Sequence, residues 1–278
     1  MTDSLPEILT GEFAPARLEL WPPQSIRVVD WNIDRGLHLD SILDFLSAFS
    51  ADLLLLQEVD LNARRTRRLN IAEEIARALR MNYVFAREFQ ELLEGSSNAP
   101  AYHGQATLSR WRLNRPRLIR FRRQSHFWRP HWFVPRIHPF QIRLRGRIAL
   151  VAEVEAAGRR LTTNNLHLES RGTDELRIAQ LDEALSDASR YGPSEAVLIA
   201  GDLNLDASRD DAAAHVHRFG FHAVVGRKKH ATVHRALFEP GRPIDWAFVR
   251  GPIQAANVEV HSKIRASDHF PLSFTLTF

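Results

Sequence analysis

The sequence predicts an α/β sandwich in which two β-sheets face each other and helices cover the outside. Two observations lead to this prediction. Strand-like and helix-like segments alternate in both halves of the chain, and no linker divides the halves. The 278 residues are also sufficient for one large domain with a continuous core. We therefore expect an N-terminal lead-in over residues 1–25 and a single domain over residues 26–278.

In the N-terminal half, four prolines and little periodicity mark the first 25 residues as a lead-in. Apolar side chains at helical spacing then predict helices over residues 40–50 and 70–80. The run DLLLLQ at residues 52–57 predicts a strand that is covered on both faces. Shorter strands are expected at residues 26–31, 83–86 and 106–108.

In the C-terminal half, two strands are expected around a turn at Ala157 and Gly158, over residues 147–154 and 160–167. Apolar residues at helical spacing predict a helix over residues 173–190. Further strands are expected at residues 196–200, 243–249, 257–261 and 272–278.

Composition excludes several kinds of chemistry. The chain has no cysteine, so it has no disulfide, no thiolate metal site and no cysteine nucleophile. A metal ion would have to be bound by oxygen or imidazole ligands. Because the longest strongly apolar run is only Leu53 to Leu56, no membrane-spanning segment is expected. No signal peptide is recognised at the N-terminus, so a cytoplasmic location is expected.

One segment has an unusual charge pattern. From Gly95 to Ala152 there is no acidic residue, yet there are twelve arginines with aromatic residues among them. Guanidinium groups pair with phosphate and aromatic faces stack on bases, so the pattern favours a polyanionic partner. The alternative is that arginine is simply the preferred cation, because the whole chain contains only three lysines.

Polar side chains with catalytic potential cluster at the ends of the predicted strands. In layered α/β folds these ends direct several loops toward one crevice, so we expect the side chains to meet there. They are Asn32, Glu58, Asn165, His167, Asp202, Asn204, Asp245, Asp268 and His269.

Three of these residues, Glu58, Asp202 and Asp268, carry the hard carboxylate ligands that Mg²⁺ or Mn²⁺ prefers. Carboxylates gathered in one crevice repel one another, so a divalent cation is expected between them. Each motif alone is ambiguous, since Gly-Asp-x-Asn after a strand is often only a turn or a helix cap.

The ordered set of motifs is more specific. VVDWNI, LLLLQEVD, HGQATLSRWRL, NNLHLES, LIAGDLN, RPIDWAFV and ASDHFPL follow one another along the chain. From about residue 26 to residue 278 the chain thus resembles the endonuclease/exonuclease/phosphatase superfamily, which includes deoxyribonuclease I, exonuclease III, neutral sphingomyelinases and inositol polyphosphate 5-phosphatases. The resemblance implies a four-layer α/β sandwich of the deoxyribonuclease I type. It also implies a metal-dependent phosphoesterase.

The resemblance implies roles for the residues around the metal. Glu58 is expected to be the principal ligand of Mg²⁺, for which Mn²⁺ would substitute, with Asn32 and Asp268 adding to the metal shell. Asp202 is expected to position or deprotonate the attacking water, and Asn204 to hold the phosphoryl group.

The remaining roles concern the phosphate and the proton. The resemblance implies that His269 binds the scissile phosphate and transfers a proton, that Asp245 fixes its tautomer, and that His167 binds a phosphate oxygen. Asn165 is expected nearby, although it could instead satisfy backbone groups at a strand edge. Gln105 stands where many relatives carry asparagine, and it could take over that residue's contact with phosphate.

The catalytic set does not select the substrate. The segment 110–147, taken as a loop, favours a nuclease acting on DNA or RNA, with Arg120, Arg122 and Arg123 as substrate-binding residues. Its aromatic run at residues 127–133 would also suit an anionic membrane surface. The alternatives are therefore a phospholipid or sphingolipid phosphodiesterase, or a phosphomonoesterase. A catalytically dead binding scaffold is a remote alternative because the catalytic residues are present. A monomer without an obligate protein partner is expected.

Overall fold

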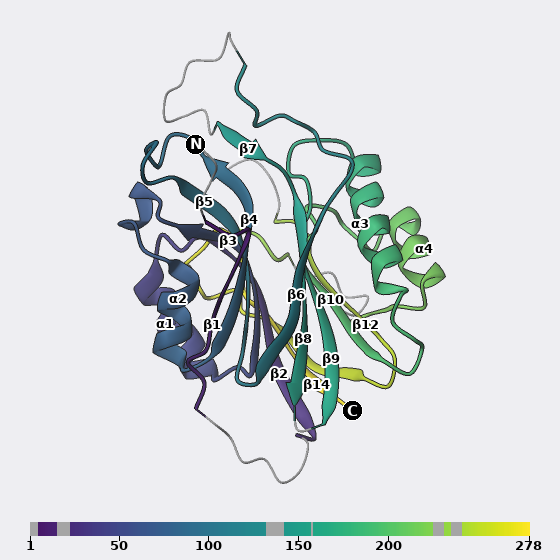
Figure 1. Cartoon of the computed structure of the whole chain (residues 1–278). Coiled ribbons are helices and arrows are strands. Elements are labelled where there is room, and N and C mark those ends of the chain that lie inside the picture. The colour runs from purple at the N-terminus through teal and green to yellow at the C-terminus, as the bar shows by residue number, and fades with distance from the viewer. Residues whose placement is uncertain (1–4, 16–22, 132–141, 157, 225–230, 235–240) are drawn as a thin grey trace.

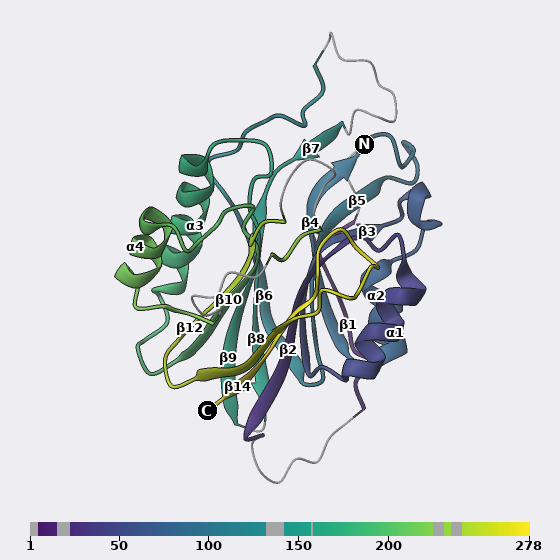
Figure 2. The same cartoon turned by 180° about the vertical axis from the view of Figure 1, so that it is seen from behind.

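The computed structural model describes residues 5–15, 23–131, 142–156, 158–224, 231–234 and 241–278. Two mixed β-sheets face each other in this part of the chain (Figure 1). One helix pair covers the outer face of one sheet, and a second pair covers the outer face of the other, as the view from behind also shows (Figure 2). The predicted four-layer α/β sandwich is confirmed.

The first sheet contains the one parallel pair of the N-terminal half, β2 (Ser25–Arg35) with β3 (Leu53–Leu61). Its remaining pairs are antiparallel, so the sheet is mixed. The order is β1-β4-β5-β3-β2-β14-β13, with β7 paired to β4. The other strands are β1 (Ile8–Gly11), β4 (Asn82–Glu91), β5 (Ala101–Ser109), β7 (Arg143–Arg145), β13 (Gln254–Val260) and β14 (Leu272–Thr277).

The second sheet has the order β11-β12-β10-β9-β8-β6. Its parallel pair is β9 (Arg159–His167) with β10 (Ala196–Asp202), and the neighbouring pairs are antiparallel. The remaining strands are β6 (Arg112–Arg120), β8 (Ile148–Ala156), β11 (His222–Ala223) and β12 (Asp245–Arg250).

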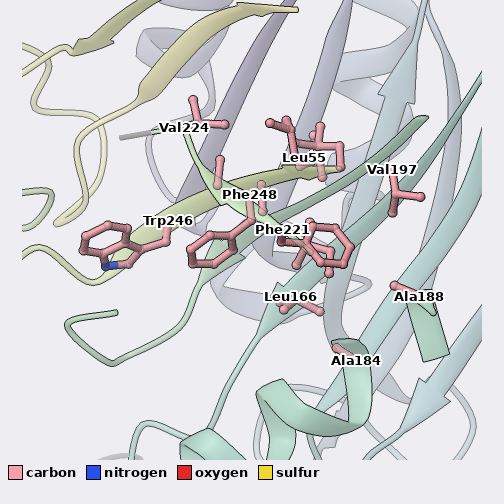
Figure 3. Close-up of a cluster of buried hydrophobic side chains, with 14 of the residues drawn as sticks. Leu55, Leu166, Ala184, Ala188, Val197, Phe221, Val224, Trp246 and Phe248 are labelled. Atoms are coloured by element: carbon pink, nitrogen blue, oxygen red, sulfur yellow. The ribbon is translucent and has the colours of Figure 1, made fainter. Parts of the chain in front are cut away.

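The helices bury apolar faces against the sheets. They are α1 (Leu39–Phe49), α2 (Ile71–Leu79), α3 (Asp174–Ala188) and α4 (Asp210–Arg218), with a short 3₁₀ turn, η1 (Arg64–Thr66). Thr173 caps α3 by accepting a hydrogen bond from the backbone N–H of Leu176. Figure 3 shows Ala184 and Ala188 of α3 near Leu166 and Val197 of the second sheet. No helix among the described residues is long and apolar enough to cross a membrane.

Polar side chains also join the two sheets. The Asn165 side chain of β9 is fully buried and donates hydrogen bonds to the carbonyl oxygens of Leu56 and Ala106 in the first sheet. Gln57 of β3 donates to Asn165 Oδ1 at 2.8 Å and to Asp30 Oδ1 at 2.8 Å. These bonds fix how β3 and β9 lie relative to each other near the ends that carry the site residues.

The structure differs from the sequence predictions mainly at three places. The lead-in contains β1, whose four residues are too few to show a period and which pairs with β4 at the sheet edge. The segment 110–147 is not wholly a loop, because β6 and β7 lie within it. β6 contains Pro116, and the pairing shifts register between Asn114 and Arg117. An edge strand tolerates such a proline. Helix α4 was not anticipated either.

The arginines of this segment also lie in unexpected surroundings. Most of them pair with carboxylates from other parts of the chain, which follows from the lack of acidic residues in the segment itself. The pairs are Arg110–Asp52, Arg112–Glu12, Arg115–Glu153, Arg117–Asp187, Arg120–Glu7, Arg122–Glu183, Arg143–Glu91, Arg145–Glu7 and Arg147–Glu88. Several of these pairs are buried, as with Arg143 and Arg147, whereas Arg112, Arg115 and Arg122 remain largely exposed. That the segment faces a polyanionic partner stays a prediction. Residues 132–141, which include part of the aromatic run, lie outside the described residues.

Gly201 of β10 lies where β9 and β10 pack closely, so a substitution at this position tests that packing. It has φ +146°, and a Cβ at this position would lie 2.0 Å from the carbonyl oxygen of Leu166. We expect Gly201→Ala to lower the free energy of unfolding by about 3 kcal/mol or more, since backbone strain and backbone overlap add. Urea unfolding measures this, with Gly192→Ala as the control because its Cβ would meet only Glu195 Oε1 at 3.7 Å. Equal, small effects of the two substitutions would contradict the packing described.

Candidate active site

Asp202 lies at the centre of the site because of strand pairing. It ends β10 and stands directly opposite His167 of β9 on one side and Asp245 of β12 on the other. A parallel and an antiparallel neighbour thus bring three chemically active side chains to one edge of the second sheet. Asp202, His167 and Asp245 are all buried.

The Asp202 carboxylate gathers donors from several elements. Asn32 at the end of β2 donates from Nδ2 to Asp202 Oδ2 at 3.1 Å. The Nε2 atoms of His167 and His269 lie 3.6 and 3.7 Å from the same oxygen. The backbone N–H of Asn204 donates to Oδ1 at 2.9 Å, while its side chain donates to the Leu168 carbonyl oxygen.

A β-bulge turns Glu58 toward this group. The pairing of β3 with β5 shifts between Leu56 and Val59, and Glu58 has φ +51°. Its Oε1 lies 3.9 Å from His167 Nε2, and its Oε2 lies 3.5 Å from Arg35 Nη2. Burial alone would raise the pKa of Glu58, but the charges of Arg35 and the nearby histidines hold it well below its usual value. The carboxylate is therefore ionised.

His269 and Asp245 form a buried pair. His269 Nδ1 lies 3.0 and 2.9 Å from the two carboxylate oxygens of Asp245, which leaves Nε2 directed toward Asp202. The His269 carbonyl oxygen accepts a hydrogen bond from Trp31 Nε1 at 2.9 Å. Burial would lower the pKa of His269, but Asp245 and Asp202 outweigh it and raise the pKa well above its usual value. The imidazole is thus held as a cation that can donate from Nε2.

The donor set fits a hard divalent cation. Asp268 is exposed beside the site and accepts a hydrogen bond from Ser267 Oγ. Burial raises the pKa of Asp34, with Arg35 opposing and the negative charges of Asp268 and Glu58 adding to it. Carboxylates on β2, on β3 and before β14 are therefore in electrostatic reach of one another, which a bound cation would relieve. Glu58, Asn32 and Asp268 supply oxygen ligands of the kind that Mg²⁺ and Mn²⁺ prefer.

The structure brings together most of the residues that the sequence singles out. Glu58, Asn32, His167, Asp202, Asn204, Asp245, Asp268 and His269 all belong to this group.

Two expected substrate-binding residues have structural surroundings instead. Asn165 is fully buried and bound to both sheets, as described above, so it matches the alternative of satisfying backbone groups. Gln105 is also fully buried and donates to the carbonyl oxygen of Ile148. Both side chains point into the space between the sheets, where an amide can bridge two strands.

The three arginines expected to bind substrate also lie elsewhere. Arg120 donates to the carbonyl oxygens of Glu88 and Gly146. Arg122 pairs with Glu183 of α3. Arg122 and Arg123 both line a surface pocket beside that helix. The Arg120 and Arg122 side chains thus have protein partners, and the backbone oxygen of Arg123 accepts a hydrogen bond from Gln180.

Sequence reasoning missed three residues near the site. Asp30 is a buried acid that follows the apolar pair Val28-Val29, and this charge was the available signal; burial and then Asp245 raise its pKa well above its usual value. Arg35 follows the DWNID motif and lies against Glu58, but nothing in its spacing marks it. His103 lies near Glu58 and His167, and its position before Gln105 gave only a weak signal.

Comparisons with known proteins agree with this arrangement. A model described as "Endonuclease/Exonuclease/phosphatase family" matches residues 31–269. No match was found among curated proteins.

Several solved structures share the fold. The endonuclease/exonuclease/phosphatase from Beutenbergia cavernae DSM 12333 is similar with a TM-score of 0.66 and 16% identity, over 92% of this chain and 72% of that one. A D. rerio TDP2 humanized by 14 mutations has a TM-score of 0.64 and 20% identity, over 92% of this chain and 100% of that one. TDP2 from C. elegans has a TM-score of 0.60 and 18% identity, over 91% of this chain and 75% of that one.

The similar structures support the two-sheet fold, and the family model spans the motifs from β2 to His269. The chain therefore belongs to the endonuclease/exonuclease/phosphatase family, whose members are metal-dependent phosphoester hydrolases.

Proposed function

We propose that this protein is a Mg²⁺-dependent phosphodiesterase that cleaves DNA or RNA by in-line attack of water. One observation carries the proposal. The Asp202 carboxylate accepts hydrogen bonds from Asn32 and the Asn204 backbone while two imidazoles face it. A general base surrounded by donors for phosphate oxygens is what hydrolysis of a phosphate ester requires.

Asp202 is suited to take the proton of the attacking water. Asn32 and the Asn204 N–H hold its two oxygens in place, so the acceptor is oriented before substrate binds. The Asn204 side chain lies beside it and would contact the phosphoryl group. Glu58, with Asn32 and Asp268, would hold the metal. A bound divalent cation would neutralise charge on the phosphate and on the leaving oxygen.

His269 and His167 serve the phosphate oxygens. His269 Nε2 would donate to the phosphoryl group because Asp245 holds Nδ1 and stabilises the imidazolium. His167 has Glu88 Oε2 3.4 Å from its Nδ1, so its Nε2 is likewise directed toward Asp202 and Glu58. Two imidazole donors near the same oxygen of Asp202 would stabilise the charge that develops on the equatorial oxygens.

An aromatic platform formed by Phe127, Trp128 and Arg171 supports a nucleic acid as the substrate. Phe127 is 56% exposed and packs edge-on against Trp128, with ring centroids 4.9 Å apart. The Arg171 guanidinium carbon lies 5.6 and 6.0 Å from the two ring centroids. Arg171 is four residues beyond His167. An exposed aromatic ring with an arginine against it suits an unpaired base.

One similar structure bears on the substrate. D. rerio TDP2, described as complexed with a single-strand DNA product, has a TM-score of 0.61 and 19% identity to this chain, over 92% of this chain and 100% of that one. We extend single-stranded nucleic acid to this chain on the combined support of this fold similarity and the platform formed by Phe127, Trp128 and Arg171.

The pair Asp245–His269 gives a first prediction. We expect Asp245→Asn to lower kcat on bis-p-nitrophenyl phosphate about 10²- to 10⁴-fold with a small change in KM, because the amide no longer stabilises the imidazolium. Circular dichroism should show an unchanged fold. A variant with wild-type kcat would show that His269 does not need this partner.

Asp202 and the metal give a second prediction. We expect EDTA to abolish hydrolysis and Mg²⁺ or Mn²⁺ to restore it in the wild type. Asp202→Asn should lower kcat about 10²- to 10⁴-fold at saturating Mg²⁺, since it removes the proton acceptor and keeps the shape. The matched control is Asp206→Asn in the following turn. Hydrolysis that persists in EDTA would refute the metal dependence.

The aromatic platform gives a third prediction. We expect Phe127→Ala to raise KM for single-stranded DNA about 5- to 150-fold, since stacking is worth about 1–3 kcal/mol per base. The KM for bis-p-nitrophenyl phosphate should stay unchanged. Arg122→Ala is the control, since Arg122 pairs with Glu183 beside α3. A parallel assay of Phe127→Ala with sphingomyelin vesicles tests the lipid alternative. If the substitution lowers hydrolysis of the vesicles and leaves hydrolysis of single-stranded DNA unchanged, nucleic acid is overturned as the substrate.

A further inference from the structure

His103 is a buried histidine for which the proposed reaction has no use. It lies in β5 opposite Asp60 of β3 and is completely buried. Its Nδ1 lies 3.3 Å from Asp60 Oδ1. Among the described residues, its Nε2 has no hydrogen-bond partner. A buried imidazole nitrogen without a partner is destabilising, so it indicates a ligand that the protein chain itself does not supply.

His167 is likewise buried with a carboxylate behind it. A carboxylate oxygen of Glu88 lies 3.4 Å from its Nδ1, while its Nε2 lies 3.6 Å from Asp202 Oδ2 and 3.9 Å from Glu58 Oε1. One nitrogen of each histidine and one carboxylate oxygen of Glu58 lie within 4.8 Å of one another. Since Asp60 faces Nδ1 of His103, the nitrogen left for a shared ligand is Nε2.

The carboxylates behind the two histidines are themselves held in place. Arg65 donates to both oxygens of Asp60 at 2.8 Å, and Arg147 donates to Glu88 Oε1 at 2.6 Å. A carboxylate that orients one imidazole nitrogen while the other faces inward is the usual arrangement behind a metal-binding histidine. Here the arrangement occurs twice around one glutamate.

The donor types differ from those at Asp202. Two imidazoles and one carboxylate favour Zn²⁺ or Co²⁺, whereas Mg²⁺ prefers oxygen ligands. Ligands about 2.1 Å from a tetrahedral ion lie about 3.4 Å from one another, so small side-chain rotations would close the set. Arg35 lies against Glu58 Oε2 and leaves Oε1 on the side of His167.

We propose that Glu58, His103 and His167 form a second divalent-metal site that binds Zn²⁺ or Co²⁺ in preference to Mg²⁺. The site rests on the proposed function only in that it shares Glu58 with the Mg²⁺ site and His167 with the proposed phosphate contacts. With Zn²⁺ or Co²⁺ bound, His167 Nε2 would ligate the ion instead of donating to a phosphate oxygen. Its fourth position would be filled by water or by a phosphate oxygen of the substrate. A site of this kind would make the choice of metal depend on His103.

Titration of the metal-free, full-length protein with Co²⁺ tests the proposal without measuring activity. In the presence of excess Mg²⁺ we expect one Co²⁺ per chain with the visible absorption of a nitrogen-containing, low-coordinate site. His103→Gln keeps a polar side chain but removes the imidazole ligand, and it should weaken Co²⁺ and Zn²⁺ binding at least about 100-fold. The matched control is His215→Gln on α4, which should bind as the wild type does.

The proposal is overturned if wild type and His103→Gln bind Zn²⁺ and Co²⁺ equally, or if the wild type binds neither. A Zn²⁺-soaked wild-type crystal gives a second measurement that needs no variant. An anomalous peak contacting Glu58, His103 and His167 supports the site, and a peak elsewhere or no peak overturns it. Phosphodiester hydrolysis by the Mg²⁺-loaded wild type is assayed separately. Its absence would refute the proposed function, while the metal-binding result would still stand or fall by itself.

Discussion

The close approach of β3 and β9, which lie in different sheets, is the constraint on which the rest of the site depends. The Asn165 side chain donates to backbone oxygens of both β3 and β5. The Gln57 side-chain nitrogen in turn donates to Asn165 Oδ1 and to Asp30 Oδ1. These buried bonds fix the ends of the two strands, one of which carries Glu58 and the other His167. A small shift of one sheet against the other would separate the proposed metal ligand from the residues around Asp202.

Much of the fold and the core of the site could be predicted from the sequence. Nearly continuous apolar runs located central strands of both sheets, because strands covered on two faces have few polar positions, as in β3 and β10. Polar residues at strand ends located the site because parallel strands end at the same edge. Glu58 and His269 are 211 positions apart in the chain, yet both lie around His167 and Asp202.

The parts that the sequence did not predict depend on tertiary contacts. β6 has too many arginines to show an apolar face, and its role at the edge of the sheet follows only from pairing with β8. Arg143 and Arg147 reach Glu91 and Glu88, which belong to a strand far away in sequence, so no local pattern distinguishes them from phosphate-binding arginines. Asn165 looked like a site residue because its position two residues before the motif histidine does not show what its side chain contacts.

In the proposed reaction one charged centre around Asp202 serves catalysis, and the aromatic platform is the source of substrate preference. A crystal structure with Mg²⁺ and a single-stranded phosphorothioate oligonucleotide would show both parts at once. We expect a phosphorothioate group within hydrogen-bonding distance of Asn204 and of His269 Nε2, with the ion bound to the Glu58 carboxylate. A phosphorothioate group bound beside Arg122 and Arg123, with no ion on Glu58, would contradict this expectation.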